Sequence, residues 1–200
     1  MDSKVLFDAI RQVKGSSLTQ ADVDLINRAL LQDIITVGTT GFSLGSAGEA
    51  LIHSFESLKL TAYKDPGPTG LPITNGWGTT VGEDGKPIKL GEVWTKEKAD
   101  RLFRRDIATM ERAVNTLIGN TPTTQNQFDA LVSFAYNVGP DMNNNGIAEG
   151  LGDSTLLKKH RAKDYAGAKA EFAKWNKAKG VVLPGLTRRR AAEAELYGKA

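Results

Sequence analysis

The sequence predicts an α+β fold in which a small antiparallel sheet lies beside a mostly helical body. Between residues 60 and 90, short apolar stretches alternate with Gly, Pro and an Asp84-Gly85 pair, the composition of strands joined by tight turns. From Thr95 onwards, apolar residues instead recur at the spacing of amphipathic helices. A chain of 200 residues is long enough for one domain with a sizeable core and a small appendage.

The first 45 residues are expected to form a separate N-terminal piece. Residues 4–14 and 19–31 carry apolar side chains at helical spacing, which predicts a helical hairpin. The following stretch, 37–48, is rich in Gly, Ser and Thr and has the composition of a linker. We therefore predict two parts: residues 1–45 with the hairpin and linker, and residues 46–200 with the main domain.

The main domain divides into a first helix, a sheet region and a series of helices. Leu51, Ile52 and Phe55 form the apolar stripe of a helix predicted over residues 47–58. Thr95 and Ser154 are residue types that cap helices at the positions where two later helices should begin. Strands are predicted over 60–64 and 71–77 around a turn at 66–70, and further helices over 127–139, 154–160, 165–176 and about 188–197.

Composition narrows the classes of function. The chain has no cysteine, which excludes disulfides and thiolate chemistry. No apolar run approaches the ~20 residues that span a bilayer, and residues 1–15 lack a secretory pattern, so we expect synthesis in a cytoplasm. Residues 158–200 hold 12 basic and 4 acidic side chains, whereas the net charge of the whole chain is +3. This region is either a solvated basic surface or a contact for a polyanion such as nucleic acid, anionic lipid or peptidoglycan.

Three polar residues stand out between Phe55 and Gly78. Glu56 ends an apolar helical run, which gives its carboxyl the partly apolar surroundings that a general acid needs. Asp65 opens a turn rich in Pro and Gly, and Thr74 would return opposite it on a paired strand. Cleavage of a glycosidic bond needs one acid to protonate the leaving oxygen and one anion to act on a water. By spacing alone, ordinary surface acids remain the alternative.

The same stretch resembles the signature of a known family. An acid followed by Ala-Tyr-x-Asp, a turn and Thr-x-Gly-x-Gly, as in residues 56–78, is similar to the catalytic signature of the bacteriophage-type lysozymes, glycoside hydrolase family 24. The resemblance covers residues 47–200 and implies a lysozyme-like fold. Three more blocks resemble the family in the same order: QFDALVSFAYNVG at 127–139, STLLKKH at 154–160 and GLTRRRAAEAELY at 185–197.

This resemblance implies roles for individual residues. Glu56 matches the proton donor of the family, and Asp65 and Thr74 match the pair that positions the attacking water. The implied reaction is hydrolysis of the β-1,4 bond between N-acetylmuramic acid and N-acetylglucosamine, with inversion at the anomeric carbon. In the family an arginine of the last helix faces the acid. We expect Arg189 in that place, with Arg190 as the second candidate.

Further residues are candidates for binding the substrate or supporting the site. Gly76 and Gly78 leave room for the close approach of a glycan chain. Trp77 either stacks on a sugar or packs in the core. Asn137 either contacts the substrate or has a structural role at the end of the central helix. No cofactor is expected.

The loop 140–153 resembles an insertion between two blocks of the family. Asp141, Asn143 and Asn145 follow the spacing of the first half of a calcium loop, but Gly152 stands at position twelve, where a bidentate Glu belongs. A polar Asx-rich loop without metal is the alternative. His53 and His160 predict no metal site, because no third ligand has a suitable spacing.

The implied function is that of a phage endolysin, a muramidase that lyses the host cell by degrading peptidoglycan. Such a protein would reach the wall through a membrane pore made by another protein. We expect a monomer that binds peptidoglycan, contacts the anionic envelope through residues 158–200 and binds no nucleic acid. A virion-associated lysozyme and a lytic transglycosylase acting on the same bond are the alternatives. A non-catalytic binding protein is disfavoured because Glu56, Asp65 and Thr74 are all present.

Overall fold

The computed structural model describes residues 41–64, 72–143 and 145–199. Residues 42–200 belong to one compact unit. The predicted N-terminal hairpin, the start of its linker, Asp65 and the turn at 66–70 lie outside the described residues. The predicted division at residue 45 therefore stays a prediction.

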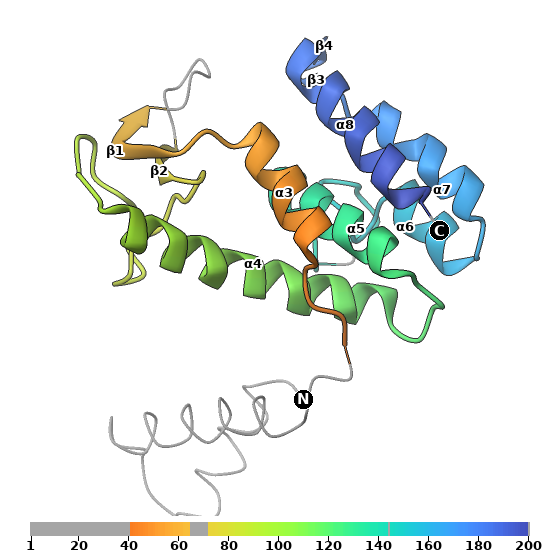
Figure 1. The fold of residues 1–200 in the computed structure, drawn as a ribbon. Helices are drawn as coiled ribbons and strands as arrows, with labels where there is room; N and C mark the ends of the chain where they lie inside the picture. The colour runs from red at the N-terminus through yellow and green to blue at the C-terminus, as the bar shows by residue number, and fades with distance from the viewer. Residues whose placement is uncertain (1–40, 65–71, 144, 200) are drawn as a thin grey trace, which may run out of the picture. The chain divides into compact units, whose positions relative to one another are not determined.

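Helix α5 is the centre of the helical body and contacts α3, α4 and α8 (Figure 1). Residues 127–135 of this helix are all buried, as the sequence predicts for a central helix. No helix among the described residues is long and apolar enough to cross a membrane. In chain order the elements are α3 (Ser46–Phe55), β1 (Lys59–Lys64), β2 (Ile73–Gly76), α4 (Lys96–Ile118), α5 (Gln125–Val138), α6 (Thr155–Arg161), α7 (Tyr165–Glu171), the 3₁₀-helix η1 (Phe172–Lys174), β3 (Lys177–Ala178), β4 (Val181–Val182) and α8 (Pro184–Tyr197).

The predicted small sheet is present. β1 and β2 pair antiparallel, with Tyr63 opposite Thr74, and isolated bridges extend the pairing into residues 75–93. The predicted turn at Asp84-Gly85 closes on the bridge between Val81 and Pro87. The lobe around this sheet has a small core of its own, separate from the core of the helical body: Ala62, Ile88, Trp94, Ala99 and Leu102.

The predicted helix starts at Thr95 and Ser154 are confirmed by their hydrogen bonds. The Thr95 hydroxyl accepts from the backbone N–H of Lys98 at 3.2 Å, and that of Ser154 accepts from the N–H of Leu157 at 3.0 Å. Each bond satisfies one of the backbone donors that a helix start leaves free.

The first helix is shorter than predicted. It ends at Phe55, not at residue 58, and Glu56 already has extended backbone angles, with φ −102° and ψ 110°. Leu58 packs against the core of the sheet lobe, together with Leu60. If the helix continued to residue 58, Leu58 would extend the apolar stripe of the helix and would not pack in the sheet lobe. We infer that the packing of Leu58 in the sheet lobe ends the helix at Phe55.

The two C-terminal helices differ from the prediction at their ends. The α-helix from Tyr165 ends at Glu171 and continues as the 3₁₀-helix η1 only to Lys174, short of the predicted residue 176. The hairpin of β3 and β4 follows, where no element was predicted, and the last helix begins at Pro184, not near 188. Lys179 and Gly180 both have positive φ, 50° and 81°, the backbone of a two-residue hairpin turn. Pro184 is well suited to a first helical turn, where its missing N–H would have no partner in any case.

Candidate active site

Glu56 lies at the C-terminal end of α3, where the chain leaves the helix for the sheet. Its backbone N–H still donates to the carbonyl of Ile52 at 3.0 Å, which fixes the residue to the last helical turn. Its side chain is 22% exposed, and Arg189 Nη1 donates to its Oε1 at 2.5 Å. The carboxyl is therefore fixed at one oxygen and still open to solvent.

The other end of α3 is held by Asp129, a buried residue of α5. Its carboxylate accepts from the backbone N–H groups of Gly45 at 2.8 Å and Gly48 at 3.1 Å. A negative charge at a helix N-terminus is stabilising, because the free N–H groups carry partial positive charge. Gly48 also allows close packing, since a Cβ there would lie 2.8 Å from the Cβ of Asp129. Both contacts fix α3, and with it Glu56, to the helical body.

Thr74 is on β2 and is only 7% exposed. Its hydroxyl donates to the carbonyl of Pro72 at 3.4 Å, a long bond that leaves its oxygen able to accept. Asp65 follows β1 directly in the sequence but lies outside the described residues. Its predicted role of positioning the attacking water together with Thr74 stays a prediction.

The two glycines of this stretch have different surroundings. Gly76 is buried with φ +61°, and a Cβ there would lie 3.1 Å from the Cβ of Ala99. Its missing side chain makes room for the core of the sheet lobe, which fits a supporting role. That Gly76 also leaves room for a glycan stays a prediction. Gly78 has φ +100°, and a Cβ there would lie 3.3 Å from Glu56 Oε2. Gly78 is thus the glycine that keeps space open beside the acid.

Trp77 connects the two lobes. Its indole N–H donates to Asp100 at 2.8 Å, its ring centroid lies 4.0 Å from that of His53, and it packs against both hydrophobic cores. These contacts fit the packing alternative for Trp77. Its carbonyl accepts from the hydroxyl of Tyr136 at 2.9 Å. Burial raises the pKa of Tyr136, and the charge of Glu56 raises it further, so this hydroxyl stays a donor.

Arg189 is 4% exposed and is held at three points besides Glu56. Its Nε donates to Glu193 at 3.2 Å and its Nη2 to the carbonyl of Ser133 at 3.4 Å. Its guanidinium carbon also lies 5.7 Å from the ring centroid of Phe55. Of the two arginines that the sequence offered, Arg189 is therefore the one that reaches Glu56.

Arg190 points to a different partner. Its Nη2 donates to Asn137 Oδ1 at 3.1 Å. Asn137 lies at the end of α5 and is exposed. Arg190 binds its amide oxygen, and the NH₂ group of the amide remains accessible. Ser133, Tyr136 and Glu193 were not singled out in the sequence. Glu193 could have been predicted, because Arg189 and Glu193 are four residues apart on one helix, the spacing at which opposite charges pair.

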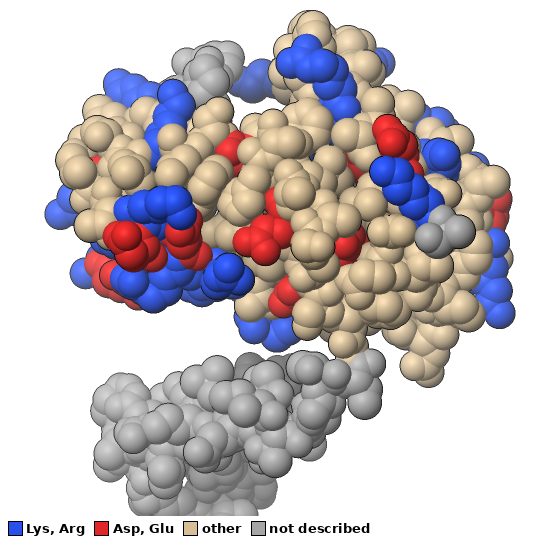
Figure 2. Space-filling model, in the orientation of Figure 1, with Lys and Arg blue, Asp and Glu red and all other residues tan. Residues whose placement is uncertain are grey.

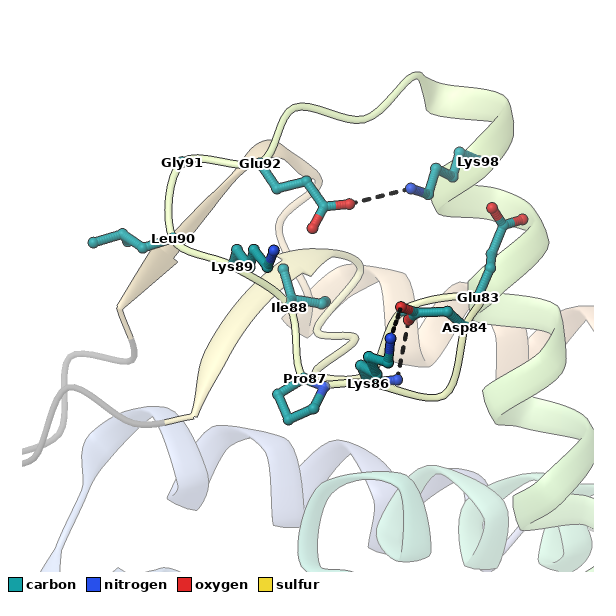
Figure 3. A pocket seen from close by; sticks show the side chains of 11 residues that line it. Glu83, Asp84, Lys86, Pro87, Ile88, Lys89, Leu90, Gly91, Glu92 and Lys98 are labelled. Carbon is teal, nitrogen blue, oxygen red and sulfur yellow. Dashed lines mark hydrogen bonds and ion pairs between the residues drawn. The ribbon is translucent and has the colours of Figure 1, made fainter.

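A hollow of about 280 Å³ adjoins this site and is bordered by Gly78, Thr80, Asp106 and Tyr136. A larger hollow, of about 660 Å³, lies in the loop 82–92 and against Lys98 (Figure 3). Two of its carboxylates are paired with its ammonium groups, Glu92 with Lys98 at 3.2 Å and Asp84 with Lys86 at 3.8 Å, and it contains none of the predicted catalytic residues. The smaller hollow beside Gly78 is therefore the one relevant to the chemistry.

The side chains of the loop 140–153 mostly bind backbone groups of the loop itself. Asp141 Oδ2 accepts from the N–H groups of Glu149 and Gly150, both at 3.2 Å. Asn143 and Asn145 accept from the N–H groups two residues further on, at 3.1 and 2.8 Å. These are Asx turns, the arrangement of the metal-free alternative. Across the described ranges, no group of three or more His, Cys, Asp or Glu is placed to hold a metal ion.

A small sheet lobe joined by one helix to a helical body, with a glutamate at the junction, defines a lysozyme-like glycosidase. The family model described as phage lysozyme matches residues 53–193, and the chain belongs to that family. Its function is that of a phage endolysin, a lysozyme whose substrate is bacterial peptidoglycan.

Individual relatives agree with this family. The chain is 38% identical over 161 residues to an endolysin of Acyrthosiphon pisum secondary endosymbiont phage 1, covering 78% of this chain and 99% of the relative. It is 41% identical to an endolysin of Bacillus phage B103, covering 78% of this chain and 54% of that longer protein. The structure of an endolysin from Escherichia coli O157:H7 phage FAHEc1 matches with a TM-score of 0.67 and 39% identity, covering 78% of this chain and 94% of that one.

Proposed function

We propose that the protein is an inverting muramidase in which Glu56 is the general acid. Glu56 gives its proton to the oxygen of the β-1,4 bond between N-acetylmuramic acid and N-acetylglucosamine. Asp65 takes a proton from the attacking water, and Thr74 helps to hold that water. The bond from the anomeric carbon to the leaving oxygen breaks while the bond to the water oxygen forms on the opposite face, which inverts the configuration.

The observation that carries this proposal is the different surroundings of the two oxygens of Glu56. Oε1 is bound to Arg189, whereas Oε2 lies beside Gly78, where no side chain fills the space. A proton donor must present one oxygen to the leaving group at hydrogen-bond distance. The space beside Gly78 is where a glycosidic oxygen could approach.

The ion pair with Arg189 has a consequence for the proton on Glu56. A neighbouring guanidinium favours an ionised carboxylate, whereas a general acid must carry a proton. A bound glycan would cover the part of Glu56 that is exposed, and removal of water disfavours the charged form.

The test is loss of turbidity of purified cell walls. Glu56→Gln keeps the size of the side chain but has no proton to give, and we expect a rate about 10³-fold lower than that of the wild type, as for a lost general acid. Glu49→Gln, on the same helix, is the matched control and should clear the walls normally. Circular dichroism verifies the fold of each variant. A folded Glu56→Gln protein that clears walls at the wild-type rate would refute the proposal.

Product analysis separates hydrolysis from the transglycosylase alternative. An inverting hydrolase leaves reducing N-acetylmuramic acid ends, first formed in the α configuration from a β bond. Attack by a hydroxyl of the same sugar would instead leave no reducing end. We expect reducing ends, and we expect Asp65→Asn to be nearly inactive because the attacking water then has no base.

We further propose that the protein works as a monomer, is made in the host cytoplasm, reaches the wall through a pore and contacts the anionic envelope. The support for envelope contact is the hairpin of β3 and β4, where exposed Lys177 and Lys179 lie beside exposed Val181 and Val182. Figure 2 shows basic side chains at the tip where this hairpin lies.

The envelope contact is tested by sedimentation with lipid vesicles. The wild type should bind anionic vesicles and not neutral ones, and a Lys177→Gln/Lys179→Gln variant should bind the anionic vesicles more weakly. Equal binding by the two proteins would contradict a role for the hairpin. Activity of intact purified virions on cell walls would favour the virion-associated alternative.

A further inference from the structure

Arg189 belongs to a buried cluster of charges. Arg190 and Glu193 lie on the same helix and are fully buried. Glu193 Oε1 accepts three hydrogen bonds: from Ser133 Oγ at 2.9 Å, from Arg189 Nε at 3.2 Å and from Arg190 Nη2 at 2.8 Å. Its Oε2 lies 2.8 Å from Arg190 Nε, but the N–H is not aligned with it, so this second contact is an ion pair and not a hydrogen bond.

The donors around Glu193 fit the charged form of its carboxyl group. Burial raises the pKa of Glu193, and both arginines oppose that shift. Burial likewise lowers the pKa of Arg190, and the Glu193 carboxylate opposes it. The guanidinium groups can only donate, so the oxygen on which Arg189, Arg190 and Ser133 converge must be an acceptor. An ionised carboxylate satisfies all three donors.

The cluster therefore holds two positive charges and one negative charge, and the remaining positive charge faces Glu56. On α5, Tyr136 is neutral because burial raises its pKa, and Asp106 of α4 acts on that same hydroxyl. On α3 itself, His53 lies one turn before Glu56 and is paired with Glu49 at 3.7 Å. Arg189 contacts the acid, Arg190 contacts Glu193, and Glu193 pairs with both arginines and so offsets their charge.

We propose that Glu193 is a positioning residue for the general acid, and this inference rests on the proposed role of Glu56. Glu193 binds Arg189 through Nε and so directs Nη1 to one oxygen of Glu56. It also offsets one of the two positive charges that α8 places beside Glu56. Without this carboxylate, two buried positive charges would lie together on α8, one of them in contact with Glu56.

The test is the pH profile of kcat/KM on soluble glycan fragments. The alkaline limb of such a profile reports loss of the proton from the general acid. Glu193→Gln keeps the shape of the side chain but removes its charge, so the alkaline limb should move to lower pH by about 1 unit, the size typical of one nearby charge. Arg190→Gln removes a positive charge and should move the limb in the opposite direction.

The double variant Glu193→Gln/Arg190→Gln restores the charge balance. Its alkaline limb should return close to the wild-type position, an outcome that a merely structural role of Glu193 does not give. The double variant also keeps the test open if a single variant fails to fold, because it leaves no uncompensated charge in the interior. A shifted limb in the folded double variant would overturn the proposal.

Glu195→Gln is the matched control, because Glu195 is exposed on the same helix and its carboxylate pairs with exposed Lys199 at 3.4 Å. Its profile should equal that of the wild type. If Glu193→Gln lowers the melting temperature but leaves the limb in place, Glu193 is structural and the inference fails. If Glu56→Gln is itself active, the proposed function fails, so the two failures are distinguishable.

Discussion

His160 should make the stability of the protein depend on pH. It is fully buried, its Nδ1 lies 2.6 Å from the hydroxyl of Tyr197, and its Nε2 lies 3.0 Å from the hydroxyl of Thr123. Burial lowers the pKa of His160 from its ordinary 6.5 to about 4, and the nearby charge of Arg161 acts in the same direction. The side chain is therefore neutral in the folded protein at neutral pH.

The sign of the effect follows from the lowered pKa. Between about pH 6.5 and about pH 4, the unfolded chain binds a proton on His160 that the folded protein does not, so stability falls as the pH falls. The shift from 6.5 to about 4 corresponds to about 3 kcal/mol, fully lost below pH 4. Between about pH 7 and about pH 4.5, the expected loss from this residue is about 2 kcal/mol.

Urea denaturation of the wild type and of His160→Gln, each at about pH 7 and about pH 4.5, isolates the contribution of His160 to the free energy of unfolding. Glutamine keeps a donor and an acceptor but does not titrate, whereas all carboxylates titrate alike in both proteins. The wild type should be the more stable at neutral pH, and its advantage should shrink by about 2 kcal/mol at the acid pH. An advantage that is the same at both pH values would refute the reasoning.

Three further predictions concern the framework of the site. Gly78→Ala should lower wall lysis at least about 10-fold with little change in fold, because a Cβ would crowd Glu56 Oε2 at φ +100°. Asp129→Ala should cost about 2 kcal/mol in urea denaturation, because two backbone N–H groups of α3 lose their acceptor. Ser154→Ala should cost about 1 kcal/mol by the same assay, through loss of the cap of α6. Unchanged lysis by Gly78→Ala would contradict the first prediction, and unchanged stability of Asp129→Ala or Ser154→Ala would contradict the second or the third.

The elements predicted best from the sequence were those that depend on local signals. Thr95 and Ser154 cap the helices that they were expected to cap, and the continuous apolar content of α5 correctly indicated a central helix. Such signals act within a few residues, so a single sequence shows them.

The errors arose where distant parts of the chain decide the structure. Leu58 packs in the core of the sheet lobe and is not part of the helix that precedes it. The hairpin before α8 was missed although Lys179 and Gly180 are a plausible two-residue turn, because its strands are only two residues long. The cluster of Ser133, Arg189 and Glu193 joins α5 to α8, and no local pattern predicts a contact between two helices.

The position of Glu56 depends on how one short helix, α3, is attached to the rest of the fold. This single helix of ten residues, about 15 Å long, is fixed at its start by Asp129 and carries Glu56 at its end. Local opening at the Asp129 end would move the acid relative to Arg189 without unfolding the rest of the helical body. Lytic activity should therefore decline at a lower temperature than the helical signal, so that heat inactivation and heat denaturation are separate events for this protein.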